Sequence, residues 1–145
     1  MIVVDLSYPD NIKFSRLCKK NSICFVQLIA PTTSIKRMKD ILRISDSTIY
    51  MISMISTTGS ALKVTTRKIM KNYEIIKKLS PLKNVIIGFG ITEKTIGKLK
   101  SANGLVVGSA ICKEITRSLK SRQNPVTNVG KLVKKLKNRI ASWIG

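Results

Sequence analysis

Two stretches in the second half of the chain each combine a short apolar run with small residues, and their spacing suits the binding of an anion. The first is Val85-Ile86-Ile87 followed by Gly88-Phe89-Gly90, and the second is Leu105-Val106-Val107 followed by Gly108-Ser109-Ala110. Each apolar run is typical of a buried strand, and the small residues suit a sharp turn or a close backbone approach. Helix-compatible sequence follows directly, so free backbone N–H groups at a helix start would face the same space. Two such junctions side by side predict a phosphate site.

A plainer interpretation exists for each junction. Gly-Phe-Gly and Gly-Ser-Ala also occur as tight turns that bind nothing. The phosphate site is favoured because the two lie on consecutive strand ends, with an Asn103-Gly104 turn opening the second strand. In a (β/α) barrel, phosphate commonly binds at the loops after strands seven and eight, beside a short helix N-terminus.

The rest of the chain alternates short apolar segments with amphipathic ones, which is typical of parallel strands joined by helices. The predicted strands are residues 2–6, 24–30 and 48–53 and the runs at Val85 and Leu105. Residues 54–60 are predicted to form a polar loop. Helices are predicted from Pro9 to near Asn21, from the N-cap Ser34 to Ile44, over about 15 residues ending before Pro81, from Thr92, over residues 110–119 and over residues 125–144.

Apolar spacing predicts which face of each helix is buried. The first helix is expected to bury Ile12, Phe14, Leu17 and Cys18; the second, Ile35, Met38, Ile41 and Leu42; and the last, Val129, Leu132, Val133, Leu136, Ile140 and Trp143. The last helix carries lysines on its other side, and we expect it to pack on the domain and not on a membrane surface.

These elements predict a single α/β domain over residues 1–145, with a hydrophobic content of 43% that suits a globular core. Five strand–helix units are too few for a closed eight-stranded barrel. They fit an open doubly wound sheet or most of a barrel, and the pattern alone leaves both open.

The strongest bias in composition is a formal net charge of +20, from 27 Lys and Arg against 7 Asp and Glu. Such a charge suggests nucleic acid or an anionic membrane as a partner. The basic residues are scattered, however, and few aromatic residues interleave with them, which argues against a specific nucleic-acid platform. No apolar run is long enough to span a bilayer. We expect the charge to favour phosphorylated ligands and acidic partners.

Cysteine and histidine usage limits the chemistry. The chain has no histidine, and Cys18, Cys24 and Cys112 lack metal-ligand spacing. Zinc chemistry and a His-based triad are therefore excluded for this chain acting alone, and no metal site is predicted. Unpaired thiols and the lack of a signal-peptide pattern at Met1 predict a cytoplasmic protein.

Five segments in one order and spacing carry a family resemblance. They are Ile2-Val3-Val4-Asp5-Leu6, Leu28-Ile29-Ala30-Pro31-Thr32-Thr33, Ile49-Tyr50-Met51-Ile52-Ser53 with Thr58-Gly59, Gly88-Phe89-Gly90-Ile91 and Val107-Gly108-Ser109-Ala110-Ile111. Together they resemble the C-terminal half of the tryptophan synthase alpha subunit, from its fourth barrel strand onward. The resemblance implies a partial (β/α)8 TIM barrel, with five parallel strands alternating with helices plus a C-terminal helix.

The family cleaves indole-3-glycerol phosphate to indole and glyceraldehyde 3-phosphate beside a pyridoxal-phosphate-dependent beta subunit. The resemblance implies that backbone N–H groups and the Ser109 hydroxyl bind the substrate phosphate, and that aromatic residues line the rest of the pocket. The positions it assigns are Gly59, Gly90, Gly108 and Ser109 for the phosphate, and Tyr50, Thr58 and Phe89 for the substrate pocket. Asp5 matches a family aspartate near the subunit interface.

The sequence also departs from the family pattern. The two catalytic carboxylates of the family lie in its first three strand–helix units, and none of the acidic residues here matches them, so no catalytic residue is assigned. Ser56 stands where the mobile loop usually has glycine, Met54 where arginine is frequent, and Ser7 where proline is common. We expect the altered loop to close less well.

Three functions follow as hypotheses. The first is a tryptophan synthase alpha-type chain that retains the phosphate-binding half. It is either one half of a split enzyme or a truncated gene product. Its partners would be the beta subunit, which would hold the pyridoxal phosphate, and, if the enzyme is split, a separate chain supplying the N-terminal half of the barrel. The second is a non-catalytic module that binds a phosphorylated ligand or the beta subunit. The third is a basic nucleic-acid-binding protein. No cofactor is expected in this chain.

Overall fold

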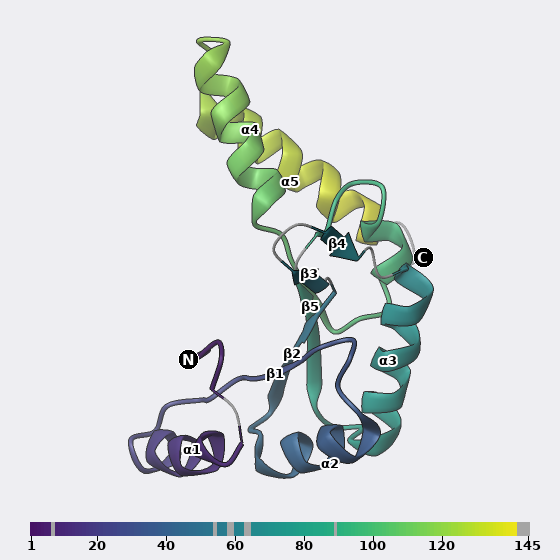
Figure 1. Ribbon diagram of the computed structural model, residues 1–145. Coiled ribbons are helices and arrows are strands. Elements are labelled where there is room, and N and C mark those ends of the chain that lie inside the picture. Colours follow the sequence, from purple (N-terminus) through teal and green to yellow (C-terminus); the bar gives the residue numbers. More distant parts are fainter. Residues whose placement is uncertain (7, 54, 58–59, 63–64, 89, 142–145) are drawn as a thin grey trace.

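A four-stranded parallel sheet forms the centre of the molecule. The structure is a computed structural model, and it describes the chain except residues 7, 54, 58–59, 63–64, 89 and 142–145. The sheet contains β1 (Gln27–Ile29), β2 (Thr48–Ile52), β5 (Asn84–Gly88) and β6 (Gly104–Val106) in that spatial order (Figure 1). Every pairing is parallel. In a doubly wound sheet the strand order reverses at one point, whereas the order here follows the chain without a reversal. The sheet is therefore a segment of a barrel wall.

The two faces of this sheet differ in burial. Side chains alternate along a strand, and the face carrying Ile49, Met51 and Ile87 is fully buried. The helices α2 (Ile35–Ile44) and α3 (Thr66–Leu79) cover that face (Figure 1). The opposite face is only partly buried, and no helix of the described part of the chain lies over it. It is the face that would point into the interior of a closed barrel.

The helix boundaries confirm most of the predicted starts and ends. The hydroxyl of Ser34 accepts a hydrogen bond from the Arg37 amide at 3.3 Å, and α2 begins there as predicted. Pro9 is the N-cap of α1 (Asp10–Lys20), and α3 ends at Leu79, two residues before Pro81. The helices α4 (Ser109–Lys120) and α5 (Pro125–Ala141) form a hairpin that extends from one end of the sheet (Figure 1).

The prediction of a strand at residues 2–6 is wrong, because that segment contains no strand in the structure. The backbone pairs beside β1 only at Met1, whose carbonyl accepts from the Val26 amide at 2.8 Å. Asp5 then takes a φ of 65°, which ends the extended conformation that a strand requires. The sheet therefore has four strands and not five, and β1 is shorter than the predicted strand at residues 24–30.

Two other predicted segments differ. The region predicted as a polar loop, residues 54–60, contains β3 (Ile55–Thr57) and the first residue of β4 (Ser60–Leu62), which pair antiparallel. Ile55 and Thr57 are β-branched and favour a strand, whereas β4 has no such residue. The helix predicted from Thr92 is only a 3-10 turn, η1 (Ile96–Leu99). The Thr95 hydroxyl accepts from the Thr92 amide at 3.0 Å, and such local bonds compete with helix formation.

The predicted buried face of α1 is wrong for Leu17, which is 56% exposed, and right for Cys18. Two polar residues, Asn11 and Ser15, are buried instead. The Ser15 hydroxyl donates to the Ile44 carbonyl at the end of α2, at 3.0 Å. This bond orients α1 with a polar face inward, which apolar spacing could not indicate.

The later helices also expose some residues of their predicted faces. Ile35 in α2 is 54% exposed, and Val133 in α5 is 45% exposed. Met38, Ile41, Leu42 and Leu136 are buried as predicted. Trp143 lies outside the described residues.

Polar side chains bind the ends of the strands to the helices. Lys83, just before β5, donates from Nζ to the carbonyls of Ser45 and Asp46, at 2.8 Å each. Burial lowers the pKa of Lys83. Asn103, just before β6, accepts at Oδ1 from the Val85 amide at 3.0 Å and from the Tyr73 hydroxyl at 3.3 Å. These bonds hold β5 and β6 in position at their amino ends, leaving the carboxyl ends to form a site.

Candidate functional site

A hollow of about 260 Å³ lies beyond the carboxyl ends of β5 and β6, on the face of the sheet that none of the described helices covers. Its lining residues are Tyr50, Gly90, Ile91, Val106, Gly108 and Ser109. In the β5–β6 ladder, Gly88 pairs with Val106. Gly90 and Gly108 follow two residues after this pair, one in each chain segment. The parallel register therefore places the two glycine junctions beside each other.

The backbone at both junctions suits an anion. Gly90 has a φ of 66°, in the left-handed region that favours glycine. Gly108 is the N-cap of α4, and no side chain caps this helix end. The Gly108 carbonyl accepts from the amides of Ile111 and Cys112, at 2.9 and 3.1 Å. The preceding amides, Ser109 and Ala110, have no acceptor within the helix, and the helix dipole adds a positive potential there.

Tyr50 forms the other wall of the hollow. Its ring lies against the backbone of Gly88, where an added Cβ would be 1.7 Å from the Tyr50 hydroxyl oxygen. The lack of a side chain at Gly88 therefore lets the tyrosine occupy this position. Burial raises the pKa of Tyr50, so the phenol is neutral at physiological pH and can donate a hydrogen bond.

The loop that contains Gly90 is attached to α5. The carboxylate of Glu93 lies 2.7 Å from Nζ of Lys135, and Nη1 of Arg139 donates to the Glu93 carbonyl at 2.8 Å. The hydrogen bond from Lys135 lowers the pKa of Glu93, and the Lys135 and Arg139 charges act in the same direction. These contacts hold one side of the hollow in place from outside it.

Four of the seven predicted site residues meet in this hollow: Tyr50, Gly90, Gly108 and Ser109. Gly59, Thr58 and Phe89 lie outside the described residues. The sequence analysis missed Ile91 and Val106. Both adjoin the predicted junctions, and their position just before or after the small residues could have indicated them. The roles of all these residues in binding stay predictions.

The described lining carries no titratable acid or base other than the tyrosine. No carboxylate, lysine or arginine is among the described residues that line the hollow. The described part of the chain also contains no group of three or more His, Cys, Asp or Glu residues that could hold a metal. The backbone amides at the two junctions suit the anion predicted from the sequence, and the described lining residues offer no acid–base pair for a reaction.

The family model for the tryptophan synthase alpha chain matches residues 1–141. The chain belongs to the tryptophan synthase alpha chain family. The tryptophan synthase alpha chain of Pelagibacter ubique is 59% identical over 141 residues, which are 97% of this chain and 53% of that protein. The alpha chain of Aquifex aeolicus is 36% identical over 140 residues, 94% of this chain and 50% of that protein. This chain thus spans about half the length of the curated relatives it matches.

Solved structures of alpha chains share the fold. The alpha subunit of Legionella pneumophila superposes with a TM-score of 0.78 at 25% identity, over 97% of this chain and 51% of the other. A chain of the tryptophan synthase complex of Pyrococcus furiosus superposes with a TM-score of 0.70 at 26% identity, over 97% and 53%. The predictions of the family and of a partial TIM barrel are therefore confirmed, with four strands in place of the five predicted.

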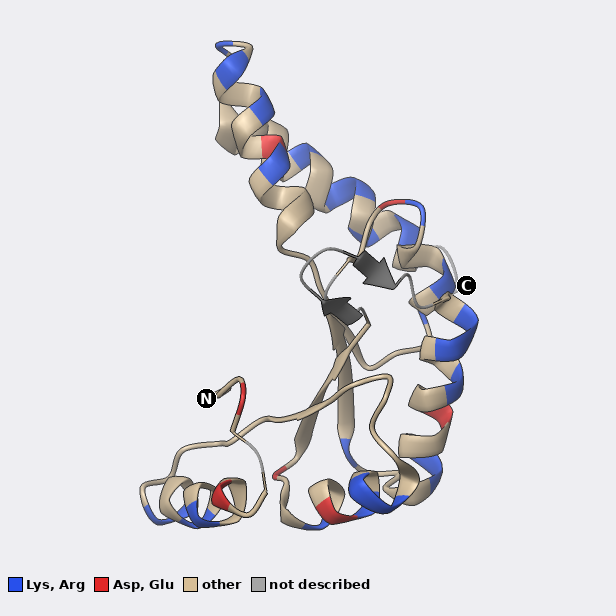
Figure 2. Ribbon diagram, in the orientation of Figure 1, with Lys and Arg blue, Asp and Glu red and all other residues tan. Residues whose placement is uncertain are grey.

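The basic residues are distributed over the helices. Figure 2 shows Lys and Arg along α1 to α5, with no gathering at the carboxyl ends of the central strands. No helix in the part of the chain that the structure describes has the length and apolar character needed to cross a bilayer. The Lys and Arg side chains are therefore not part of the described lining of the hollow, and their charge can attract an anion only through long-range electrostatics.

We predict that Gly88→Ala lowers the free energy of unfolding by about 1–3 kcal/mol, because the new methyl group overlaps the Tyr50 ring. In a Tyr50→Ala background the same substitution should cost clearly less. Urea unfolding of the two single variants and the double variant measures this coupling. Gly97→Ala is the matched control, because a Cβ there meets nothing within 4 Å. Equal losses from Gly88→Ala with and without the Tyr50 ring would contradict the described contact.

We predict that Glu93→Gln reduces the acid sensitivity of the fold. The pKa of Glu93 is lowered in the folded state. Its carboxylate therefore adds stability above its ordinary pKa of 4.5, and this stability is lost as the pH falls through the lower folded value. Thermal unfolding between pH 7 and pH 3 should show a shallower decline for the variant. Glu74→Gln, at an exposed position of α3, is the control; the same change in slope for both variants would rule out a specific role of Glu93.

Proposed function

We propose that this chain is the phosphate-binding half of a tryptophan synthase alpha-type barrel. The observation that carries the proposal is the shared hollow at Gly90, Gly108 and Ser109, where the uncapped start of α4 adjoins a glycine with positive φ. Backbone amides at a helix N-terminus bind phosphate without a basic side chain. The family match over residues 1–141 supports the same ligand.

The proposed ligand is indole-3-glycerol phosphate, the substrate of the family. Its phosphate would accept hydrogen bonds from the amides at Gly90 and Ser109 and from the Ser109 hydroxyl. The glycerol and indole parts would extend along the open face of the sheet toward Tyr50, whose neutral phenol can donate a hydrogen bond. By resemblance, Gly59, Thr58 and Phe89 would complete the phosphate site and the substrate pocket.

The proposed chemistry needs a second half. Cleavage of this carbon–carbon bond requires an acid for the indole ring and a base for the glycerol hydroxyl. No carboxylate is among the described residues that line the hollow, and this chain spans about half of its relatives. We therefore assign the acid and base to the first strand–helix units of the family barrel, whether another chain or another segment supplies them. We expect the chain alone to be inactive.

The open face of the sheet is the contact surface for that half. Leu28, Tyr50 and Ile86 are only partly buried on it, whereas their neighbours on the other face are fully buried. Closing the barrel would remove this apolar area from water, at about 25 cal/mol per Å². A net charge of +20 favours an acidic counterpart through long-range attraction.

The beta subunit of tryptophan synthase is the further partner that we propose. A solved neighbour of this fold is a tryptophan synthase complex. Pyridoxal phosphate would belong to the beta subunit, and no residue of this chain is assigned to it. The second candidate function is a module that binds a phosphorylated ligand or the beta subunit without chemistry, and the same hollow supports it. The scattered basic residues (Figure 2) favour both over nucleic-acid binding.

We predict that the chain binds glycerol 3-phosphate and that Ser109→Asp or Gly90→Asp weakens this binding at least about tenfold, because a carboxylate repels the phosphate and occupies its space. Isothermal titration calorimetry measures the affinity. Ser101→Asp, at an exposed turn before β6, adds the same charge away from the hollow and should leave the affinity nearly unchanged.

The two candidate functions differ in what restores turnover of indole-3-glycerol phosphate. The purified chain alone should show none. Adding the N-terminal half of an alpha chain should produce turnover if the chain is half of an enzyme, and should not if it is a binding module. An unchanged affinity in both Asp variants would remove the proposed phosphate site altogether.

A further inference from the structure

The hairpin of α4 and α5 carries exposed apolar side chains on both of its helices. Leu119 of α4 is 62% exposed and Val126 of α5 is 79% exposed, and Ile115 and Val133 are exposed as well. Within each helix the two residues lie one or two turns apart, so they form a row along one face. Both helices project beyond the carboxyl ends of the strands, and the turn between them lies farthest from the sheet (Figure 1).

The two rows lie on the same side of the hairpin. Nδ2 of Asn128 in α5 donates to the Ser118 hydroxyl in α4 at 3.0 Å, which identifies the faces that the helices turn toward each other. Leu119 lies about 100° around α4 from Ser118, and Val133 lies about 140° around α5 from Asn128, in the same sense. Because the helices run in opposite directions, rotation in the same sense brings both rows to one side. We call this surface the hairpin stripe; its residues are Ile115, Leu119, Val126 and Val133.

Lysines lie at the outer edges of the hairpin stripe. Lys120 follows Leu119 and Lys134 follows Val133, so each lysine lies about 100° beyond the stripe, on the outer side of its own helix. Lys137 lies one turn after Val133, at the end of the α5 row. All three lysines are exposed, and none of them makes an ion pair with another residue that the structure describes.

The charge of the hairpin is almost entirely positive. From Ser109 to Ala141 the sequence has a single acidic residue, Glu114, and the Arg117 guanidinium lies 2.7 Å from its carboxylate. The basic residues of this segment are Lys113, Arg117, Lys120, Arg122, Lys131, Lys134, Lys135, Lys137 and Arg139. A partner that covers the stripe and carries carboxylates at its edges would therefore match both the apolar rows and the charge around them.

The surface favours a helix as the occupant. Packed helices lie about 8–10 Å apart, so a groove runs between the two rows, and an amphipathic helix can lay its apolar face in such a groove. Gly130, one turn after Val126, leaves room there, because an added Cβ would meet nothing within 4 Å. A second copy of the chain would bring its own lysines against these. Membrane-surface helices use aromatic residues on their apolar face, and residues 109–141 include no Phe, Tyr or Trp.

We propose that the hairpin stripe binds an acidic amphipathic helix of a partner protein, distinct from the other half of the barrel. Apolar residues on one face of that helix contact the stripe, and its carboxylates pair with Lys120, Lys134 and Lys137. The other half of the barrel would extend the sheet sideways from its edge strands, whereas the hairpin projects beyond the carboxyl ends (Figure 1). The stripe includes no residue of the phosphate hollow, so this interaction does not depend on the proposed function.

The test is a titration of the full chain with a labelled synthetic peptide of about 18 residues, with leucines on one helical face and glutamates elsewhere. Fluorescence anisotropy measures the affinity, and methyl NMR signals locate the contact. We expect saturable binding that shifts the methyl signals of the hairpin stripe and weakens with salt. Absence of saturable binding, or methyl shifts confined to other parts of the chain, would overturn the proposal.

Two control peptides separate the apolar contact from simple attraction of charge. One has lysine in place of every glutamate, and the other has the original composition with the leucines distributed around the helix. We expect each to bind at least about tenfold more weakly than the acidic amphipathic peptide. Equal binding of either control peptide would overturn the proposal, because the occupant would then need no acidic edge or no apolar face.

Variants of the stripe provide the second arm. We expect Leu119→Ser and Val133→Ser each to lower the affinity for the acidic peptide about tenfold. Both side chains are already exposed, so thermal stability should change little. Leu82→Ser is the matched control, because Leu82 is 96% exposed and lies between α3 and β5, and it should leave the affinity unchanged. Undiminished binding in Leu119→Ser and Val133→Ser would overturn the proposal.

Three further measurements test the choice of occupant. The N-terminal half of an alpha chain should not displace the peptide, and Leu119→Ser should change neither sedimentation of the chain nor its binding to phosphatidylglycerol vesicles. Displacement by that half, or a dimer or vesicle complex that Leu119→Ser abolishes, would assign the stripe to another occupant and overturn the proposal. Glycerol 3-phosphate affinity should be the same in all these variants, so a failure here is distinct from a failure of the proposed function.

Discussion

The parallel register between β5 and β6 is the constraint on which the site depends. Gly88 pairs with Val106, and this single alignment places Gly90 and the start of α4 at the same end of the sheet, beyond the carboxyl ends of the two strands. A shift of one residue would turn alternate side chains to the other face and separate the two junctions. The bond from the Val85 amide to Asn103 helps to fix this alignment from the amino ends of the two strands. The bonds from Lys83 attach the start of β5 to the segment before β2. The two glycine junctions are therefore brought together by strand pairing, while the Tyr50 side chain supplies the other wall of the hollow.

The chemistry of the hollow follows from its backbone. Its described lining contains no basic side chain, although the chain carries 27 Lys and Arg. Attraction of an anion from solution is a property of the whole charge distribution and weakens with salt. We assign binding at short range to the backbone amides at the start of α4 and beside Gly90. Charged groups on flexible side chains would bind an anion there with less geometric specificity. The two effects act over different distances, and only the second can select phosphate geometry.

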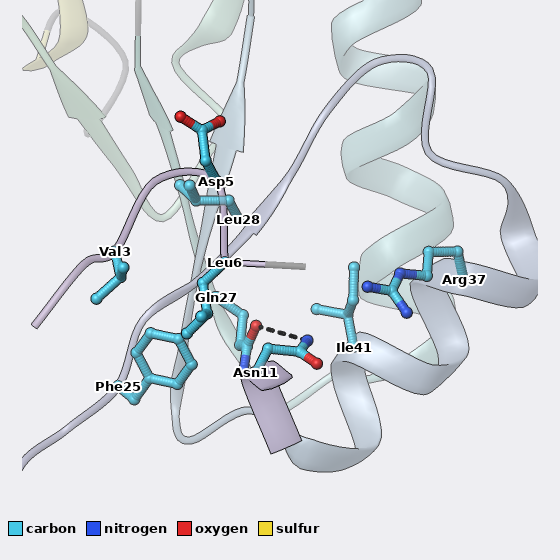
Figure 3. A pocket seen from close by; sticks show the side chains of 9 residues that line it. All are labelled: Val3, Asp5, Leu6, Asn11, Phe25, Gln27, Leu28, Arg37 and Ile41. Atoms are coloured by element: carbon cyan, nitrogen blue, oxygen red, sulfur yellow. Dashed lines mark hydrogen bonds between the residues drawn. The ribbon is translucent and has the colours of Figure 1, made fainter. Parts of the chain in front are cut away.

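Much of this could be predicted from the sequence. Small residues after β-branched runs indicated Gly90, Gly108 and Ser109, because turn chemistry is local. Ser34 and Pro81 marked helix ends for the same reason. The prediction of a strand at residues 2–6 was wrong, because an apolar run does not reveal that Asp5 adopts a left-handed backbone conformation. The prediction of the buried face of α1 was wrong because the Ser15 hydroxyl donates to the Ile44 carbonyl, a partner distant in sequence. The hydrogen bond between the buried side-chain amides of Asn11 and Gln27 (Figure 3) is likewise nonlocal, because the two residues are 16 positions apart in sequence.

The most direct test of the central claim is an NMR titration of the nitrogen-15-labelled chain with glycerol 3-phosphate. If one phosphate contacts both junctions, the backbone amide signals of Gly90 and Ser109 shift together and yield the same dissociation constant, with larger shifts than amides at the amino ends of the strands. Shifts confined to one junction, or two different constants, would contradict a shared phosphate site.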